Sequence, residues 1–195
     1  ACGEGNDDPR RNGEFHFLKR FKAAHSGQSV VVFDVGANVG SWCIEAARGF
    51  EGKILIYAFE PSAKTFEKLC ENIKESGLGE VIKPINCGLS DINGRDTLHI
   101  EHSMAGTNSL FARRIPKNDV YEGGSETVNL LCGEDFCKDN GVTHIDLLKI
   151  DTEGNELAVL QGGVRTLRQL KPNIIFECWP DIGERDEMFK WFSAE

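Results

Sequence analysis

The sequence predicts an α/β fold, with a mostly parallel central sheet and helices on both of its faces. The segment VVVFDVGANVG, residues 30–40, joins an apolar strand to a glycine turn that opens a helix. A second apolar run ends at Glu60, twenty positions after Gly40. Further apolar runs alternate with helical segments along the chain. A strand, a glycine turn, a helix and an acid that ends the next strand form the nucleoside-binding half of a Rossmann-like fold.

The first half of the chain predicts alternating helices and strands. Phe15, Leu18 and Phe21 recur at helical spacing and predict a short helix packed on a sheet edge. Apolar runs bounded by turn residues predict strands at 30–34, 53–59 and 81–86, with helices at 40–49 and 62–76 between them. Ser62 suits a helix N-cap. Pro84 places the third strand towards an edge, because proline cannot donate to a strand ladder.

The second half predicts one long loop between regular elements. Asn93-Gly94 is a strong turn dipeptide, so residues 87–101 predict a turn and a hairpin arm. Residues 102–125 lose all periodicity and predict a functional or mobile loop. The remaining segments predict strands at 127–131, 145–151 and 172–179, and helices at 155–161 and 184–193.

Length and charge narrow the class of protein. The 195 residues suffice for one domain with a sizeable core. We expect residues 1–22 to form a flexible segment with a short helix, and residues 23–195 to form the functional domain. The net charge of −9 argues against a nucleic-acid partner. No apolar run approaches the roughly 20 residues that cross a membrane, so no membrane partner is expected.

The cysteines predict a cellular compartment. Seven cysteines are scattered along the chain, and Cys132 and Cys137 lack the C-x-x-C spacing of a zinc knuckle. Cys43, Cys70 and Cys178 fall in predicted strands and helices, where a free cysteine behaves as a small apolar residue. We therefore expect them to be reduced and structural, which favours a cytoplasmic location.

The glycine turn favours S-adenosylmethionine over a dinucleotide. In the GxGxxG fingerprint the second glycine clears room for a pyrophosphate, but here that position is Asn38. The carboxylate of Asp34 repels phosphate and suits the ammonium group of a methionine-like ligand. We therefore expect S-adenosylmethionine as the cofactor, with Glu60 accepting hydrogen bonds from its ribose hydroxyls.

Polar residues that end parallel strands are expected to meet on one rim of the sheet. These segments are 34–40, Glu60, 86–88, 151–153 and 177–179.

Three groups on or above this rim are candidates for a general base. Asp151 ends a predicted strand and Glu153 lies two residues on, and neighbouring carboxylates favour protonation of one of them. Alternatively, Asp151 caps the following helix and Glu153 orients backbone. His102 begins the irregular segment and is a third candidate.

Two further features concern charge on the rim. Lys149 alternates with apolar residues on a predicted central strand, and we expect it to pair with a carboxylate because a buried unpaired ammonium is costly. Asp151, Glu153 and Glu177 offer oxygen ligands to Mg²⁺ in principle. No ligand spacing demands a metal, so none is predicted.

An ordered set of motifs resembles a known family. The segments DVGANVG, AFEP, INCGLSD, NSL, LLKIDTEGNELAVLQGG and IIFE resemble the FkbM family of S-adenosylmethionine-dependent methyltransferases. The most specific is KIDTEGNE, Lys149 to Glu156. The resemblance implies a class I methyltransferase fold and methyl transfer to oxygen in sugars or secondary metabolites. Only 16 residues follow Trp179, too few for a helix and two strands, so the C-terminal hairpin of class I sheets is expected to be missing.

The resemblance also implies roles for individual residues. The glycine turn and Asp34 would hold the methionine part, Glu60 the ribose, and Cys87 with Gly88 the adenine, while the transferring methyl would point towards Asp151 and Glu153. The predicted cofactor-binding residues are Asp34, Gly36, Ala37, Asn38, Gly40, Glu60, Pro61, Cys87 and Gly88, and the predicted catalytic residues are Asp151 and Glu153.

The predicted function is O-methylation of a hydroxyl on a saccharide or small metabolite, with S-adenosylmethionine as donor. Two alternatives stay open. One is a non-catalytic methyltransferase-like domain that binds a ligand or a partner protein. The other is an NAD-linked oxidoreductase, which Asn38 opposes. Neither the identity of the acceptor nor the oligomeric state follows from these residues.

Overall fold

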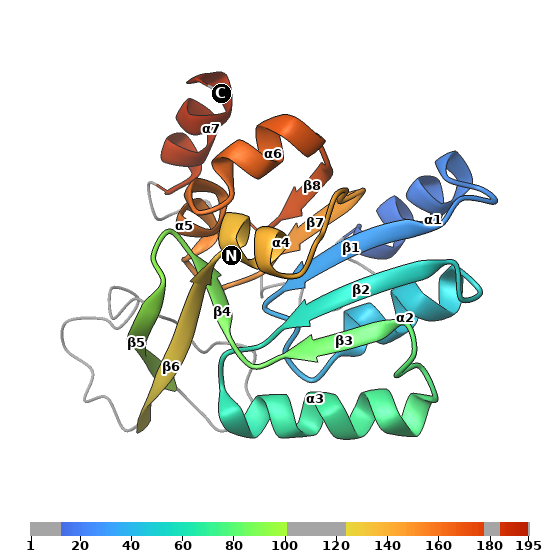
Figure 1. The fold of residues 1–195 in the computed structure, drawn as a ribbon, viewed down its shortest axis with the longest axis horizontal. Coiled ribbons are helices and arrows are strands. Elements are labelled where there is room, and N and C mark those ends of the chain that lie inside the picture. Colours follow the sequence, from blue (N-terminus) through green and yellow to red (C-terminus); the bar gives the residue numbers. More distant parts are fainter. Residues whose placement is uncertain (1–12, 101–123, 178–183, 195) are drawn as a thin grey trace, which may run out of the picture.

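A computed structural model of the chain describes residues 13–100, 124–177 and 184–194. It contains a five-stranded parallel sheet in the order β3-β2-β1-β7-β8 and a three-stranded sheet in the order β4-β6-β5 (Figure 1). The predicted loop at 102–125 and its His102 lie outside the described residues, except for the last two positions of the loop, which belong to β6.

The helices and strands have the following bounds. The first half contains α1 (Glu14–Ala24), β1 (Val30–Val35), α2 (Ser41–Gly49), β2 (Ile54–Phe59), α3 (Ala63–Ser76), β3 (Ile82–Ile85), β4 (Gly88–Ser90) and β5 (Gly94–Ile100). The second half contains β6 (Gly124–Cys132), α4 (Gly133–Asp139), β7 (Leu147–Ile150), α5 (Glu156–Gln161), α6 (Val164–Leu170), β8 (Asn173–Phe176) and α7 (Glu184–Ala194).

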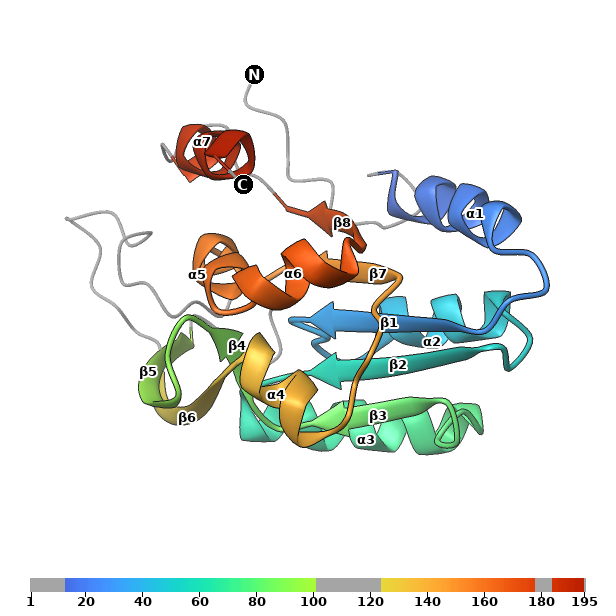
Figure 2. The ribbon, with the colours of Figure 1, turned by 45° about the horizontal axis from the view of Figure 1, so that its top comes forward.

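The central strand β1 is buried along its whole length, because helices cover both faces of the parallel sheet. Val30 and Val32 face a core cluster that α1, α2 and α3 complete. The alternate residues Val31, Phe33 and Val35 face a second cluster, to which α4, α5, α6 and α7 contribute. Figure 2 shows α4, α5 and α6 together on one side of the sheet. The predicted fold class is therefore confirmed.

Several predicted elements are confirmed with small shifts at their ends. The strand that contains Pro84 is β3, and it forms an edge of the large sheet, as expected. The short N-terminal helix is α1, and its Phe21 packs on Phe50 after α2, with ring centroids 5.9 Å apart. Among the described residues, no helix has the length and apolar character needed to cross a membrane.

The predicted turn and hairpin arm are present, with bends at residues 91–93 before β5, but the strands on either side of the turn do not pair with each other. β5 pairs antiparallel with β6, and β6 also pairs in parallel with β4, so β6 separates the two strands that flank this dipeptide. The side chain of Asn93 bonds to residues far along the chain. Its Nδ2 donates to Asp135 Oδ2 (2.6 Å), and its Oδ1 accepts from the backbone N–H of Cys132 (2.7 Å). These long-range bonds hold the turn between β4 and β5.

Two short helices, α4 and α6, were not predicted. Each has only seven residues, which is too short for a clear helical period. Between α5 and α6 lies Gly162, where a β-carbon would collide with the carbonyl oxygen of Ser90. Glycine at this position therefore allows the end of α5 to pack closely against β4. The sequence pattern alone does not reveal this contact.

Candidate active site

A cavity opens where β1, β2 and β7 end, at the rim that the topology predicts. Its wall contains Val35, Gly36, Asn38, Glu60, Pro61, Thr65, Gly88, Leu89, Leu98, Asp151, Thr152, Glu153 and Asn155. The structure thus brings together five of the predicted cofactor-binding residues and both predicted catalytic residues. The predicted residues Asp34, Ala37, Gly40 and Cys87 do not line this wall.

The glycine turn between β1 and α2 is held by the end of β2. The backbone N–H groups of Gly36 and Ala37 both donate to the carbonyl oxygen of Phe59, at 3.0 and 2.9 Å. Gly36 has φ +79°, and a β-carbon there would collide with the carbonyl oxygen of Asp151. Asn38 is also left-handed, with φ +49°. Asparagine tolerates this conformation better than most residues, so it can replace the second glycine of a dinucleotide turn.

Glu60 follows β2 and is nearly buried, with 7% of its surface exposed. Its Oε2 accepts from the backbone N–H of Asn38 and its Oε1 from that of Ser62, each at 3.0 Å. These two bonds fix the carboxylate in the cavity wall. Each oxygen retains a further lone pair, so ribose hydroxyls can still donate to it.

Burial raises the pKa of Glu60 to about 7, against the two backbone N–H groups, which lower it. The folded state therefore holds a proton that the unfolded state releases near its ordinary value of 4.5. The stabilising contribution is complete below that value and is lost as pH rises through about 7.

We expect the free energy of unfolding to fall as pH rises from 5 to 8, by an amount on the order of 3 kcal/mol from Glu60. Urea unfolding of the ligand-free protein across this range measures the slope. Glu60→Gln, which cannot titrate, should remove most of it. An equal slope in both proteins would show that other groups cause the pH dependence.

Asp34 lies deeper than its predicted role requires. Its carboxylate is fully buried and lies 3.3 Å from the ammonium of Lys149, which is its neighbour in register on β7. The Lys149 ammonium also donates to Asp151 Oδ2 at 3.2 Å. The expected pairing of Lys149 with a rim carboxylate is confirmed. The carboxylate of Asp34 therefore pairs with Lys149 in the interior. Of the two acids that contact Lys149, Asp151 is the one that lines the cavity.

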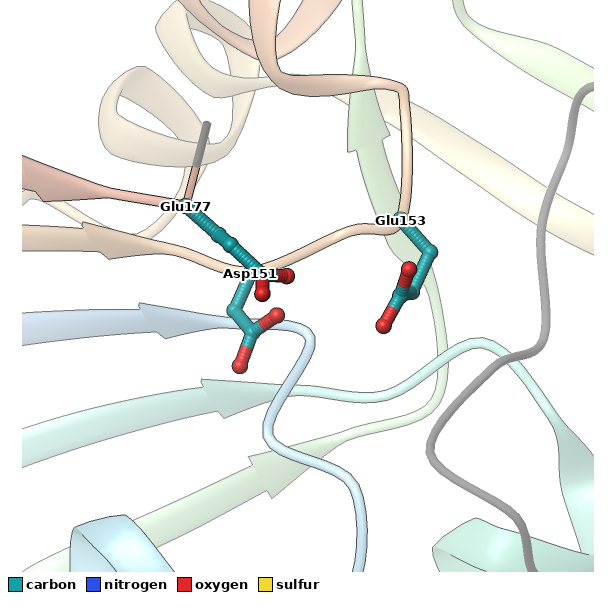
Figure 3. Close-up of side chains that lie close together, drawn as sticks. All are labelled: Asp151, Glu153 and Glu177. Atoms are coloured by element: carbon teal, nitrogen blue, oxygen red, sulfur yellow. The ribbon is translucent and has the colours of Figure 1, made fainter. Parts of the chain in front are cut away.

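Three carboxylates gather beside the cavity (Figure 3). Asp151 and Glu153 lie in the loop after β7, and Glu177 directly follows β8. One oxygen atom from each lies within 4.8 Å of the others. Such a concentration of negative charge favours a positively charged ligand or reacting group. The same three carboxylates are groups that could act as ligands for a divalent cation.

The loop that carries Asp151 and Glu153 is shaped by Glu156. The Oε1 of Glu156 accepts from the backbone N–H of Thr152 (3.0 Å), the hydroxyl of Thr152 (3.0 Å) and the backbone N–H of Gly154 (3.1 Å). Glu153 adopts φ +56°, a left-handed conformation that costs energy for a residue with a long side chain. The tight loop held by Glu156 is what maintains it.

The alternative role of Asp151 as a helix cap is wrong. Helix α5 begins at Glu156 and its N-cap residue is Asn155, four positions beyond Asp151. Glu156, which sequence reasoning missed, orients the backbone of this loop by accepting from the N–H groups of Thr152 and Gly154. Its only signal was its place at the end of the KIDTEGNE motif.

Sequence reasoning also missed residues that join separate segments. Asn86 Nδ2 donates to the carbonyl oxygens of Glu60 (2.9 Å) and Pro61 (3.0 Å). Asn155 Nδ2 donates to the carbonyl oxygen of Leu89 at 3.0 Å. Leu98 reaches the cavity wall from the second sheet. Asn86 lay within the recognised INCGLSD motif, but nothing local marked Leu98, because β5 reaches the site only through its pairing with β6.

Cys87, which was predicted to contact the adenine, is buried. Burial raises the pKa of its thiol to about 11, so it is protonated at neutral pH. The five cysteines of the described chain are all free, in agreement with the expected reduced state.

Comparison with known proteins identifies the family. The model of the FkbM methyltransferase domain matches residues 34–193. The chain belongs to this family. The match covers the glycine turn, Glu60 and the loop that carries Asp151, so the motifs that frame the cavity are those of an FkbM-type methyltransferase.

Curated proteins similar to this FkbM-family chain carry methyltransferase names. Methyltransferase sdnD of Sordaria araneosa is 30% identical over 183 residues, covering 80% of this chain and 69% of sdnD. Hexuronic acid methyltransferase AglP of Haloferax volcanii is 32% identical over 157 residues, covering 80% of this chain and 59% of AglP. The 2-O-methyltransferase NoeI of Sinorhizobium fredii is 28% identical over 152 residues, covering 72% of this chain and 60% of NoeI. The chain thus spans about three-fifths to two-thirds of their lengths.

Solved structures share the fold of this FkbM-family chain at low identity. The N-terminal domain of human METTL16, solved with S-adenosylhomocysteine, has a TM-score of 0.51 at 12% identity, covering 95% of this chain and 62% of that chain. Precorrin 8w decarboxylase from Methanobacterium thermoautotrophicum has a TM-score of 0.50 at 16% identity, covering 92% and 70%. These likenesses support the Rossmann-like methyltransferase architecture alone.

Proposed function

We propose that this domain transfers a methyl group from S-adenosylmethionine to a hydroxyl oxygen of a saccharide or small metabolite. The observation that carries the proposal is the arrangement of the cavity wall, which has Glu60 in one part and the Asp151–Glu153 loop in another. A nucleoside with a cationic tail needs both a hydrogen-bond acceptor for its ribose and negative charge for its tail. The wall provides both, on an FkbM-family fold.

The residues present fit this cofactor. Glu60 is fixed as an acceptor for ribose hydroxyls, and the turn of Gly36 and Asn38 brings backbone close to the cavity. Pro61 and Gly88 offer an apolar surface beside Glu60 for the adenine. When bound, S-adenosylmethionine supplies a methyl group on an activated sulfonium.

The chain's own contribution is orientation and proton removal. An acceptor hydroxyl must approach the methyl group in line and lose its proton as the carbon–oxygen bond forms. The carboxylates of Asp151 and Glu153 lie in the cavity wall, where either can take that proton. We assign Glu153 as the base, because Glu156 holds the backbone on both sides of it at the cavity wall, and Asp151, which accepts from Lys149, as the group that orients the acceptor.

The acceptor class follows from the names of relatives and from charge. AglP is named for hexuronic acid and NoeI for 2-O-methylation. A third relative is 31-O-demethyl-FK506 methyltransferase FkbM of Streptomyces tacrolimicus, 29% identical over 158 residues. All three names point to small-molecule or saccharide acceptors. The net charge of −9 opposes a nucleic-acid acceptor. We place these activities in residues 23–195 and the protein in the cytoplasm.

Calorimetry tests the cofactor assignment. We expect S-adenosylhomocysteine to bind and NADH not to bind, and equal affinity for both would overturn the assignment. Transfer of labelled methyl from S-adenosylmethionine to a panel of sugars, uronic acids and polyols then tests the reaction. Cofactor binding with no transfer to any panel member would favour the non-catalytic alternative.

Above pH 7, where the Glu60 carboxyl is ionised, we expect Glu60→Ala to weaken binding of S-adenosylhomocysteine by about 10–100-fold, because charge-assisted hydrogen bonds to the ribose are lost. Calorimetry measures the change. Glu75→Ala is the matched control, because Glu75 is an exposed glutamate on α3 outside the cavity wall. Unchanged affinity in Glu60→Ala would mean that the ribose lies elsewhere.

A further inference from the structure

A single buried ammonium lies between two carboxylates at the end of β7. The side chain of Lys149 is 5% exposed, and its Nζ lies 3.3 Å from Asp34 Oδ1 and 3.2 Å from Asp151 Oδ2. The two carboxylates differ in their surroundings, since the side chain of Asp34 is fully buried and that of Asp151 is 37% exposed. Lys149 therefore connects the protein interior to the cavity wall.

The buried end of this connection anchors the ammonium. In the described part of the chain, neither oxygen of Asp34 accepts a hydrogen bond within the usual geometry; burial raises the pKa of Asp34, and its ion pair with Lys149 is the main interaction that opposes this rise. The ring of Trp42 lies 5.6 Å from the Lys149 Nζ and adds a cation–π contact. Burial alone would lower the pKa of Lys149, but the charges of Asp34, Asp151 and Glu14 together outweigh it and the pKa is raised. The ammonium is thus charged and confined.

We propose that Lys149 is a positioning residue for methyl transfer. Its ammonium is anchored by Asp34 and holds the Asp151 carboxylate at the cavity wall. The ammonium also partly neutralises the negative charge that Asp151 presents to the ligand. This inference rests on the proposed function. It gives the buried pair a task beyond stability, because the position of Asp151 depends on a residue that does not itself line the cavity.

The offset of charge matters for the reaction. Methyl transfer discharges the sulfonium, so a cation present in the ground state is lost as the transition state forms. A free carboxylate next to the sulfonium would stabilise the charged ground state more than the transition state and would slow the chemical step. A carboxylate that is paired with an ammonium attracts the sulfonium less strongly, and the ion pair keeps its oxygen atoms in a fixed orientation.

A double variant separates this task from simple neutralisation of Asp34. Asp34→Asn/Lys149→Met removes the buried acid and its counter-ion together, so the net charge is unchanged and no buried charge is left unpaired. Asp151, however, loses its ammonium partner. If Lys149 only neutralised Asp34, both stability and turnover would recover in the double variant relative to Lys149→Met.

The readouts include one that needs no acceptor. Calorimetry gives the dissociation constants of S-adenosylhomocysteine and S-adenosylmethionine, which differ by the sulfonium charge. We divide the dissociation constant of S-adenosylhomocysteine by that of S-adenosylmethionine. In the double variant we expect this ratio to rise about fivefold or more, because the freed carboxylate of Asp151 attracts the sulfonium cation. We expect kcat to fall about tenfold or more, with the KM of the acceptor changed much less. Lys138→Met, which removes an exposed lysine of α4 outside the cavity wall, is the control.

Lys149→Arg gives a second measurement should the double variant fold poorly. It keeps the positive charge but moves its donor atoms, so the ratio of dissociation constants should stay near the wild-type value while kcat falls. The inference is overturned if a folded double variant, or Lys149→Arg in its place, keeps the wild-type kcat. A double variant with an unchanged ratio also overturns it. Failure of the wild-type protein to bind either ligand would instead refute the proposed function.

Discussion

Gly36→Ala is expected to lower the free energy of unfolding by about 3 kcal/mol or more and to abolish cofactor binding. Two costs add up, because the residue has φ +79° and its new β-carbon would meet the carbonyl oxygen of Asp151. That oxygen belongs to backbone at the end of β7, so relief requires β1 and β7 to separate where the cavity forms. Urea unfolding and calorimetry with S-adenosylhomocysteine measure the two effects.

Gly27→Ala is the matched control for this substitution. Gly27 has a similar φ of +83°, but a β-carbon there would meet no atom within 4 Å. The control therefore includes the backbone strain without the collision. If Gly36→Ala costs no more stability than Gly27→Ala, the close approach of the two strand ends is not what requires glycine.

Removal of charge at the Asp151–Glu153 loop is expected to give the largest loss of activity. At least one of Asp151→Asn and Glu153→Gln should lower kcat by about 100-fold or more, the usual scale for loss of a general base. Both substitutions preserve shape, and S-adenosylhomocysteine carries no sulfonium charge, so its dissociation constant should change little. Steady-state kinetics with an acceptor from the methyl-transfer panel measures kcat.

Asp139→Asn serves as control, because Asp139 ends α4 and is exposed outside the cavity wall. Our assignment predicts the larger loss in Glu153→Gln. A larger loss in Asp151→Asn would exchange the two roles. Near wild-type turnover in both variants would place the base elsewhere in the chain.

The architecture and the outline of the cofactor cavity follow from local sequence features. A buried strand, a glycine turn and an acid after the next strand lie within one stretch of chain, from Val30 to Glu60. Period, turn residues and spacing are local properties, so they predict β1, α2 and β2 closely. The parallel order of the large sheet then places Asp151 on the same rim as Glu60.

Other features required the tertiary structure because they depend on segments far apart in the chain. The strand that pairs with β5 is β6, which follows residues 101–123, and the local turn signal at Asn93-Gly94 does not identify this partner. Pairing with β6 is what brings Leu98 to the cavity wall. A turn signal locates a reversal of the chain, but it does not say which strand pairs with the arm that follows.

From the sequence by itself, the class of fold, the family resemblance, the cofactor class and the acids on the rim could be determined, because each depends on residue types at short, regular spacings. Only the tertiary structure decided how charge is distributed among those acids. Asp34 and Lys149 are neighbours solely because β1 and β7 pair in register. Burial of that pair commits Asp34 to the interior and leaves Asp151 to the ligand, since a charge removed from water must find its partner inside the protein.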